Sequence, residues 1–320
     1  MLLVVTVAFV VVNLLPGDPA RVIAGGFATE ETLEKINADL GLDKPLVPRY
    51  FDYLGDLAQG DMGTSFESQV PIRSEVSRFL PATLELVVPS LLFAAIGGIL
   101  LGTLGAYFRG RAPDRIAGLL TSIGQSVPDF FLGIVLIYVG FFRLGLTPGP
   151  EGRLGFLDRA PEPRTNFMMI DAVLARDWAI LGSLVSHSIL PWATLGIVYA
   201  AYFARTTRNV VSTALDSQQV EFARACGLSE RKVLYYAFLE ARTSVLTFGG
   251  ILFAALIGGA AIVESVFSWN GFGQWGLDGM LRLDIPVILG FVVVSGILTL
   301  LVFFLLDLTV MKLDPRVEET

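Results

Sequence analysis

Residues 285–310 read IPVILGFVVVSGILTLLVFFLLDLTV, and this stretch decides the fold class of the chain. Its one charged residue, Asp307, lies near its end. A helix needs about 20 predominantly apolar residues to cross the hydrocarbon core of a bilayer. The stretch therefore predicts a transmembrane helix.

Other parts of the chain have the same character. Four further segments meet or approach the required length and a shorter one begins the chain: residues 84–108, 116–142, 189–204, 245–263 and 2–15. Overall, 53% of the residues are hydrophobic and 17% are charged, whereas soluble domains are about one quarter charged. The mean hydropathy is +0.66. We therefore predict an all-α integral membrane protein with about six transmembrane helices.

The first segment, residues 2–15, is shorter than the others. It has only about 14 residues and no basic run precedes it. We expect a truncated or misannotated start of the chain. A cleaved signal peptide is the alternative, but the basic n-region is absent, and the segment runs into Leu15-Pro16-Gly17 in place of a small-x-small cleavage site.

Composition argues against several classes of site. The chain has one cysteine, Cys226, and one histidine, His187, so we expect neither a disulfide framework nor a cysteine or histidine metal centre. The net charge of −7 argues against nucleic acid as a partner, because binding to phosphates needs a surplus of lysine and arginine. No paired catalytic residues face each other within the spans, so no enzyme is expected.

Lysine and arginine gather in particular loops, and this predicts the orientation. Short cytoplasmic loops of membrane proteins are enriched in these residues. Here they cluster after the second span, between the fourth and fifth spans, and at the end of the chain: Arg109, Arg111, Arg115, Arg205, Arg208, Arg224, Arg231, Lys232, Arg242, Lys312 and Arg316. Both termini are therefore predicted to be cytoplasmic.

This orientation divides the chain into regions. The divisions are a first span at 1–15, an extracytoplasmic cap region at 16–83, a transmembrane core at 84–310 with a cytoplasmic loop at 214–239, and a cytoplasmic tail at 311–320. In the cap region, residues 29–40 have helical periodicity, with Thr29 as a possible N-cap and two glutamates in the first turn. We expect this region to be a small folded cap.

The cytoplasmic loop at 214–239 has the pattern of two helices separated by a bend. Gly227 stands where a glycine in the left-handed region ends a helix, and Ser229 can cap the next helix. On the first helix, Val220, Ala223 and Gly227 form a narrow face of small residues that a partner protein could approach closely. An amphipathic helix lying on lipid headgroups is the alternative, but it would need a larger apolar stripe.

The same loop carries a resemblance. Residues 221–231, Glu-Phe-Ala-Arg-Ala-Cys-Gly-Leu-Ser-Glu-Arg, resemble the Glu-Ala-Ala loop of binding-protein-dependent ABC importer permeases. Seven further stretches resemble the B-type permease of dipeptide, oligopeptide and nickel importers, in order and over essentially the whole chain: LLPGDP at 14–19, GLDKPL at 41–46, GDMGTS at 60–65, LPATLEL at 80–86, SVPDFFLG at 126–133, ESVFSWNGFG at 264–273 and LDPR at 313–316.

The resemblance implies a permease subunit of the type I ABC importer fold that works by alternating access in a prokaryotic plasma membrane. It implies a second, C-type permease, two ABC ATPases and an extracytoplasmic solute-binding protein as partners. The chain has no phosphate loop of the Gly-x-x-x-x-Gly-Lys-Ser/Thr type, so ATP and Mg²⁺ would be used by the partner ATPases and this chain would bind no cofactor. The implied ATPase-coupling residues are Val220, Glu221, Ala223, Arg224, Gly227 and Leu228.

The resemblance also leaves the cargo open. Dipeptides and oligopeptides are the commonest substrates of this branch, and other members carry nickel chelates, glutathione or sugars. The chain departs from the family pattern at three places: Cys226 replaces a lysine, Asn270 replaces a common proline, and the helix after the loop lacks the usual His, Arg, Asn and Pro pattern.

Ionisable residues within the spans are candidates for the translocation path, because such groups usually face a cavity or a partner. Asp129 follows Pro128 in the middle of the predicted span 116–142, and Glu264 ends the span 245–263. The alternatives are a helix kink at Pro128, with Asp129 satisfied by a partner helix, and an interfacial position for Glu264. A proton-coupled secondary transporter is a less favoured reading, since inverted repeats and a relay of buried acids and histidine are not evident.

Overall fold

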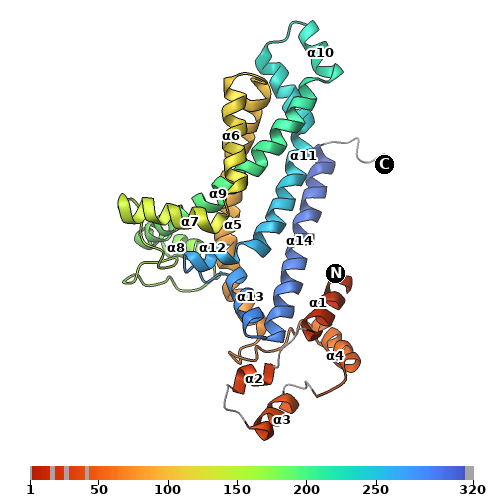
Figure 1. The fold of residues 1–320 in the computed structure, drawn as a ribbon, viewed down its shortest axis with the longest axis vertical. Helices are drawn as coiled ribbons and strands as arrows, with labels where there is room; N and C mark the ends of the chain where they lie inside the picture. The colour runs from red at the N-terminus through yellow and green to blue at the C-terminus, as the bar shows by residue number, and fades with distance from the viewer. Residues whose placement is uncertain (1, 15–18, 25–28, 40–42, 314–320) are drawn as a thin grey trace.

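The computed structural model describes residues 2–14, 19–24, 29–39 and 43–313, and within these ranges it contains helices and no named strand (Figure 1). The parts of the family-like stretches at 15–18, 41–42 and 314–316 lie outside the described residues, as does most of the predicted tail at 311–320. The prediction of an all-α chain is confirmed for the described ranges.

Four helices are long and apolar enough to cross a membrane: α5 (Ile72–Tyr107), α9 (Trp178–Leu215), α11 (Glu230–Gly259) and α14 (Ile285–Leu313). They run along the length of the molecule in Figure 1. The shorter helices are α1 (Leu2–Leu14), α2 (Pro19–Ala24), α3 (Glu30–Asp39), α4 (Leu46–Ala58), α6 (Ala112–Ser126), α7 (Asp129–Leu136), α8 (Met168–Ala175), α10 (Gln218–Ala225), α12 (Ala261–Val266) and α13 (Phe272–Leu281).

The segment predicted as a span at 116–142 is not one straight helix, and a kink is present at Pro128. The chain forms α6, breaks, and continues as α7 and a π-helical segment, η1 (Ile137–Arg143), and the two parts are bent by 99°. Val127 is extended, with ψ at 122°, and Pro128 follows it. A proline disfavours helical geometry in the residue before it, so the helix ends at Ser126. With this bent pair counted as one span, the described residues contain up to five spans, and α1 is the sixth apolar helix.

The remaining spans are longer than their apolar stretches. α5 begins at Ile72, although the apolar stretch begins at residue 84, so this helix crosses the predicted boundary between cap and core without a break. α9 and α11 likewise begin more than two turns before the predicted 189 and 245. The polar first turns of α5 and α11 are compatible with helices that emerge from the bilayer into water.

Helices α5 and α9 form the closest helix pair of the core. Gly98 and Gly102 of α5 face α9 so closely that a Cβ on Gly98 would lie 2.6 Å from the carbonyl oxygen of Ala200, and one on Gly102 would lie 2.5 Å from that of Ala204. Glycines four residues apart allow two membrane helices to approach with their backbones in contact. Any larger side chain at these positions would force α5 and α9 apart.

The short apolar helix α1 packs on the beginning of α14 together with α4. Phe9 of α1 stacks on Tyr53 of α4 at 5.7 Å between ring centroids, and it meets the edge of Tyr50 at 5.4 Å. The same cluster includes Ile288 and Leu289 of α14. The predicted cap region thus contacts the core through α4, and α3 begins at Glu30 directly after Thr29.

Candidate functional site

Polar side chains gather at two ends of the helical body. One end holds the beginnings of α5 and α13, and we call it the α13 end. The other holds α10, at the top of Figure 1, and we call it the α10 end. The predicted orientation places the α13 end outside the cell and the α10 end in the cytoplasm.

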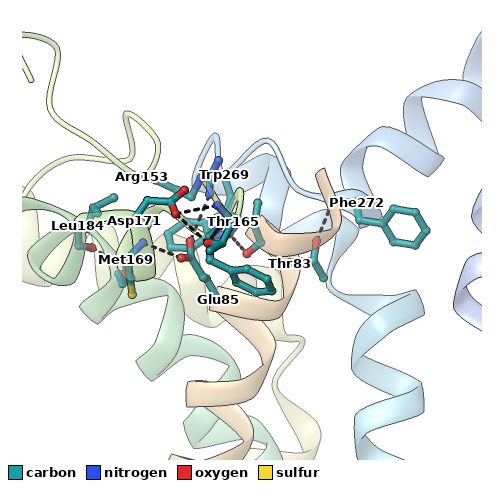
Figure 2. A network of polar contacts seen from close by, with 12 residues as sticks. Thr83, Glu85, Arg153, Thr165, Met169, Asp171, Leu184, Trp269 and Phe272 are labelled. Atoms are coloured by element: carbon teal, nitrogen blue, oxygen red, sulfur yellow. Dashed lines mark hydrogen bonds and ion pairs between the residues drawn. The ribbon is translucent and has the colours of Figure 1, made fainter. Parts of the chain in front are cut away.

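Glu264 of α12 is the centre of the α13 end. Its side chain is fully buried, with a relative exposure of 0%. One carboxylate oxygen accepts a hydrogen bond from the hydroxyl of Thr83 in α5, and the other accepts one from the backbone N–H of Gln274 at 2.7 Å. Thr83 in turn accepts from the backbone N–H of Phe272 at 2.7 Å (Figure 2). The carboxylate therefore joins α12, the beginning of α13 and α5.

This position does not fit the predicted role of Glu264 in the translocation path. A carboxylate that lines an aqueous path has oxygens open to solvent, whereas both oxygens of Glu264 are used inside the protein. The position next to the first residues of α13 is favourable for a negative charge, because the N-terminus of a helix carries a partial positive charge. The structure thus assigns Glu264 a fixed place in the packing.

Glu85 of α5 lies in a second buried contact. Its side chain forms an ion pair with Arg153 at 3.3 Å, in which the side chains are 6% and 12% exposed, and it accepts from the backbone N–H of Met169 at 2.7 Å. Pro89, one turn later, has no N–H to donate to the carbonyl oxygen of Glu85. The indole of Trp192 in α9 donates to that oxygen instead, at 2.9 Å. The loop that carries Arg153 is therefore tied to α5.

Asp171 of α8 holds the same loop further along the chain. Its side chain accepts from the backbone N–H groups of Arg164 at 3.2 Å and Thr165 at 2.9 Å, and from the hydroxyl of Thr165 at 2.8 Å. Burial by itself raises the pKa of this carboxyl, but these hydrogen bonds outweigh it and lower the pKa below its usual range. Thr83, Glu85, Arg153, Asp171 and Glu264 are called the carboxylate network below.

The loop after η1 and the turn before α13 enclose a cleft of about 740 Å³ beside this network. Its walls include Arg78, Phe79, Glu151, Arg153, Asp171 and Trp269. Glu151 pairs with the ring of His187 in α9 at 3.5 Å, and His187 lies 2.8 Å from the carbonyl oxygen of Ser183. No sequence pattern indicated that Arg78 and Arg153 share a cleft.

The turn between α12 and α13 contains one of the departures from the family pattern. Asn270 has φ at +52° and Ser268 has φ at +53°. Asparagine tolerates the left-handed region, whereas a proline ring fixes φ near −65°. The asparagine therefore allows a turn here that the family's common proline would exclude.

At the α10 end, the predicted helix, bend and helix are confirmed. Helix α10 ends at Ala225, Gly227 has φ at +74°, and Ser229 precedes α11 in an extended conformation. The Ser229 hydroxyl makes no capping hydrogen bond. Open space surrounds the Cα of Gly227, so the need for glycine comes from its backbone conformation alone. We call residues 218–236 the α10 hairpin.

The predicted outward face of small residues is wrong for Val220. This side chain is 1% exposed and packs against Ala214, Val233 and Ala237, so it holds α10 onto α9 and α11. The outward face instead carries Phe222, which is 72% exposed, with Glu221 and Arg224 beside it. Ala223 and Leu228 are half-buried at the edge of the same cluster.

Asp129, the other predicted path residue, is the first residue of α7 at the 99° bend. It is half-buried, and its carboxylate accepts from the backbone N–H of Phe130 at 2.8 Å. It is also close enough to the hydroxyl of Tyr199 in α9 to act on it electrostatically. The structure therefore places Asp129 at a helix start beside α9 and not in the middle of a straight span.

Ion pairs near the α10 end fix the helices beneath it. Arg208 of α9 forms a forked contact with Asp114 of α6, at 2.6 and 2.9 Å, and Asp114 also accepts from the backbone N–H of Gly110. Arg109 pairs with Asp216 at 2.7 Å on the surface. These contacts connect the α5–α6 turn to the segment that leads into α10.

The all-helical body, the bent pair and the α10 hairpin together define a membrane permease that contains no catalytic constellation within the described residues. Residues 98–319 match the family described as binding-protein-dependent transport system inner membrane component, and residues 1–87 match the N-terminal part described for the same transport systems. The chain belongs to this family, and it is a transport subunit of an ABC importer and not itself an enzyme.

Named relatives agree with this assignment. The chain is 37% identical to the di/tripeptide transport system permease protein DppB of Pseudomonas aeruginosa, over 98% of this chain and 94% of that protein. It is 36% identical to the probable D,D-dipeptide transport system permease protein DdpB of Escherichia coli K12, over 98% and 92%. The fold is similar to that of an inward-facing MetNI methionine ABC transporter, with a TM-score of 0.52 at 20% identity over 73% of this chain and 93% of that chain.

Proposed function

We propose that the chain is one of two different permeases of a peptide importer and moves dipeptides or oligopeptides across the plasma membrane by alternating access. The observation that carries the proposal is the similarity to dipeptide permeases over 98% of the chain. The partners are a C-type permease, two ABC ATPases that use ATP and Mg²⁺, and an extracytoplasmic solute-binding protein. The surrounding medium is the lipid bilayer.

The α10 hairpin is the proposed contact with an ATPase. Glu221 and Arg224 lie on its exposed face, so they are available to a partner. Val220, Ala223 and Leu228 act from behind by holding the helix in place. Gly227 sets the direction in which the chain turns into α11, because few other residues adopt a positive φ at low cost. In this arrangement a push on α10 is transmitted to α11 through the bend.

Asp129 is the proposed residue of the translocation path. It lies where α6 and α7 are bent by 99°, and a carboxylate at membrane depth is stable only beside a polar group or water. Its charge suits the cationic amino terminus of a peptide. Glu264 is not part of this proposal, because both of its oxygens are already bonded inside the chain.

The orientation is proposed from the distribution of lysine and arginine: both termini and the α10 hairpin are cytoplasmic, and the carboxylate network is outside. Single-cysteine labelling in intact cells tests it, after Cys226 is replaced by serine. We expect a membrane-impermeant maleimide to label a cysteine at Arg159 and to spare one at Ser229. Labelling of Ser229→Cys from outside would overturn the orientation.

The cargo is tested with the complex in proteoliposomes. Uptake of a radiolabelled dipeptide, driven by ATP and dependent on the binding protein, is the expected result. Uptake of a nickel chelate with no uptake of dipeptides or longer peptides would contradict the peptide assignment and leave the importer assignment in place.

A further inference from the structure

Two arginines line the cleft beside the carboxylate network, and they differ in exposure and in their ionic contacts. Arg153 lies against Glu85, and its side chain is 12% exposed. Arg78 is exposed on α5, and its guanidinium lies 5.4 Å from the centroid of the Phe79 ring. Within the part of the chain that the structure describes, Arg78 has no ion-pair partner.

The two guanidinium groups act on each other. Burial lowers the pKa of Arg153, Glu85 and Glu264 oppose this effect, and the charge of Arg78 adds to it. Two like charges that face one cleft repel each other, and an anion between them would remove this repulsion. Arg78 and Arg153 both line the same space of about 740 Å³, which is large enough to admit a small polar group.

The acidic side chains around the cleft do not supply the anion between Arg78 and Arg153. Asp171 is occupied by Arg164 and Thr165, and Glu151 pairs with His187. Glu85 contacts Arg153 through one oxygen, while the other oxygen is bonded to the backbone N–H of Met169. None of these contacts reaches Arg78.

We infer that this cleft binds a carboxylate group between Arg78 and Arg153. A guanidinium presents several N–H donors in a planar fork that matches a carboxylate, and such charge-assisted hydrogen bonds are stronger than neutral ones. The inference rests on the proposed orientation, in which the cleft opens outside the cell. The carboxylate then comes from one of two sources, the free C-terminus of a peptide or an acidic side chain of the binding protein.

In the proposed site, the ligand carboxylate and Glu85 compete for Arg153. An incoming carboxylate shares Arg153 with Glu85, so the ion pair that ties the loop to α5 is weakened when the cleft is occupied. Removing the charge of Glu85 frees Arg153 for the ligand. Arg78→Gln and Glu85→Gln should therefore change the affinity in opposite directions, which a loss of folding would not do.

The test uses the whole complex of permeases and ATPases in nanodiscs. Saturation-transfer NMR measures binding of Ala-Ala and of Ala-Ala amide, and surface plasmon resonance measures binding of the ligand-free solute-binding protein. Arg78→Gln is compared with Arg73→Gln, an exposed arginine on the same helix that does not line the cleft. We expect Arg78→Gln to weaken one of the two interactions about tenfold, and Arg73→Gln to change neither.

The outcomes distinguish the two possible sources of the carboxylate. Weaker binding of Ala-Ala, with Ala-Ala amide already weak for the unaltered complex, identifies the peptide C-terminus. Weaker binding of the solute-binding protein, with Ala-Ala unchanged, identifies an acidic side chain. Unchanged affinities in Arg78→Gln, or weaker binding in Glu85→Gln, would overturn the inference. Labelling of Arg159→Cys from inside would instead overturn the orientation, and dipeptide uptake is measured independently of both.

Discussion

The α13 end and the α10 end differ in how their charged residues are held. At the α13 end, Glu264 is fully buried, and the Glu85–Arg153 pair is 6% and 12% exposed. At the tip of the α10 end, the Arg224–Glu230 pair is 46% and 53% exposed. The same kinds of side chain are therefore placed in two different dielectric environments.

This difference indicates different tasks. An exposed ion pair contributes about 0–1 kcal/mol and can be exchanged for another partner at little cost. Breaking a buried pair costs about 3–5 kcal/mol, because it leaves an uncompensated charge. The buried contacts of the α13 end therefore resist rearrangement, whereas the exposed pair at the tip of the α10 end can be exchanged for the contacts of a partner at little cost.

The largest predicted effect is a loss of stability when the buried contacts of the α13 end are removed. Glu264→Ala removes the acceptor for the Thr83 hydroxyl and for the backbone N–H of Gln274 and leaves both buried. Each unsatisfied group costs about 1–3 kcal/mol, so we expect a loss of about 3 kcal/mol and a clearly lower melting temperature of the purified complex. Glu221→Ala, on the exposed face of α10, is the matched control. Equal melting temperatures for the two variants would contradict the contrast between the ends.

The second prediction concerns transmission at the α10 end. Gly227→Val places a β-branched residue at φ +74°, which costs about 1 kcal/mol or more and redirects the chain into α11. We expect normal assembly and receptor docking, while substrate-stimulated ATP hydrolysis and uptake fall together.

The neighbouring residue gives the control for this variant. Cys226 is exposed and has φ at −75°, so Cys226→Ser should retain uptake close to the unaltered level. Uptake by Gly227→Val at the unaltered level would remove the coupling assignment of the hairpin.

A third, smaller effect is expected at the bend between the ends. Asp129→Asn keeps the size of the side chain and its hydrogen bond to the N–H of Phe130 but removes the negative charge. Uptake of peptides with a cationic amino terminus should fall several-fold, since the ion pair with the substrate is lost. Assembly should be unchanged, as judged by co-purification of the subunits. Loss of assembly would favour a role in helix packing.

The smallest effect depends on pH and tests the loop over the cleft. The pKa of Asp171 is lower in the folded protein than in the unfolded chain, so its contribution to stability is complete above the unfolded value of about 3.9. The contribution is lost as the pH falls through the folded value. We expect the loop at residues 159–167 to resist pepsin at pH 5 and to be cleaved increasingly below about pH 4. Asp171→Asn should remove this dependence; an identical profile in both proteins would exclude the carboxylate as its cause.

The apolar stretches predicted the existence of the spanning helices but not their ends. Hydropathy reports which residues prefer lipid, whereas a helix continues for as long as its backbone hydrogen bonds are maintained. Thus α5 begins at Ile72, well before the apolar stretch starts. A kink at Pro128 was an alternative from the sequence, because a proline disfavours helical geometry in the residue before it, but the 99° bend was not predicted.

In the candidate site, local backbone features were predicted from the sequence, whereas contacts between distant residues were not. The conformation of Gly227 depends on its neighbours in the sequence and was predicted correctly. Glu85 and Arg153 are 68 positions apart, and Thr83 and Glu264 are 181 apart, so their pairing depends on the tertiary fold. The close approach at Gly98 and Gly102 also depends on the tertiary fold, but it could have been predicted, because two glycines four residues apart in an apolar helix are a known signal of close helix packing.

The Glu264 contacts have a consequence for how the molecule can deform. Since one carboxylate joins α5, α12 and the beginning of α13, a displacement of α5 or α13 relative to α12 has to break a buried hydrogen bond. A rotation axis cannot pass between them without breaking the buried contacts. At Ala260, where α11 ends and α12 begins, the backbone N–H of Glu264 still donates to the carbonyl oxygen of Ala260 at 2.8 Å. In the proposed orientation, α11 therefore leads from the cytoplasmic α10 hairpin to a group of helices that one buried carboxylate holds together.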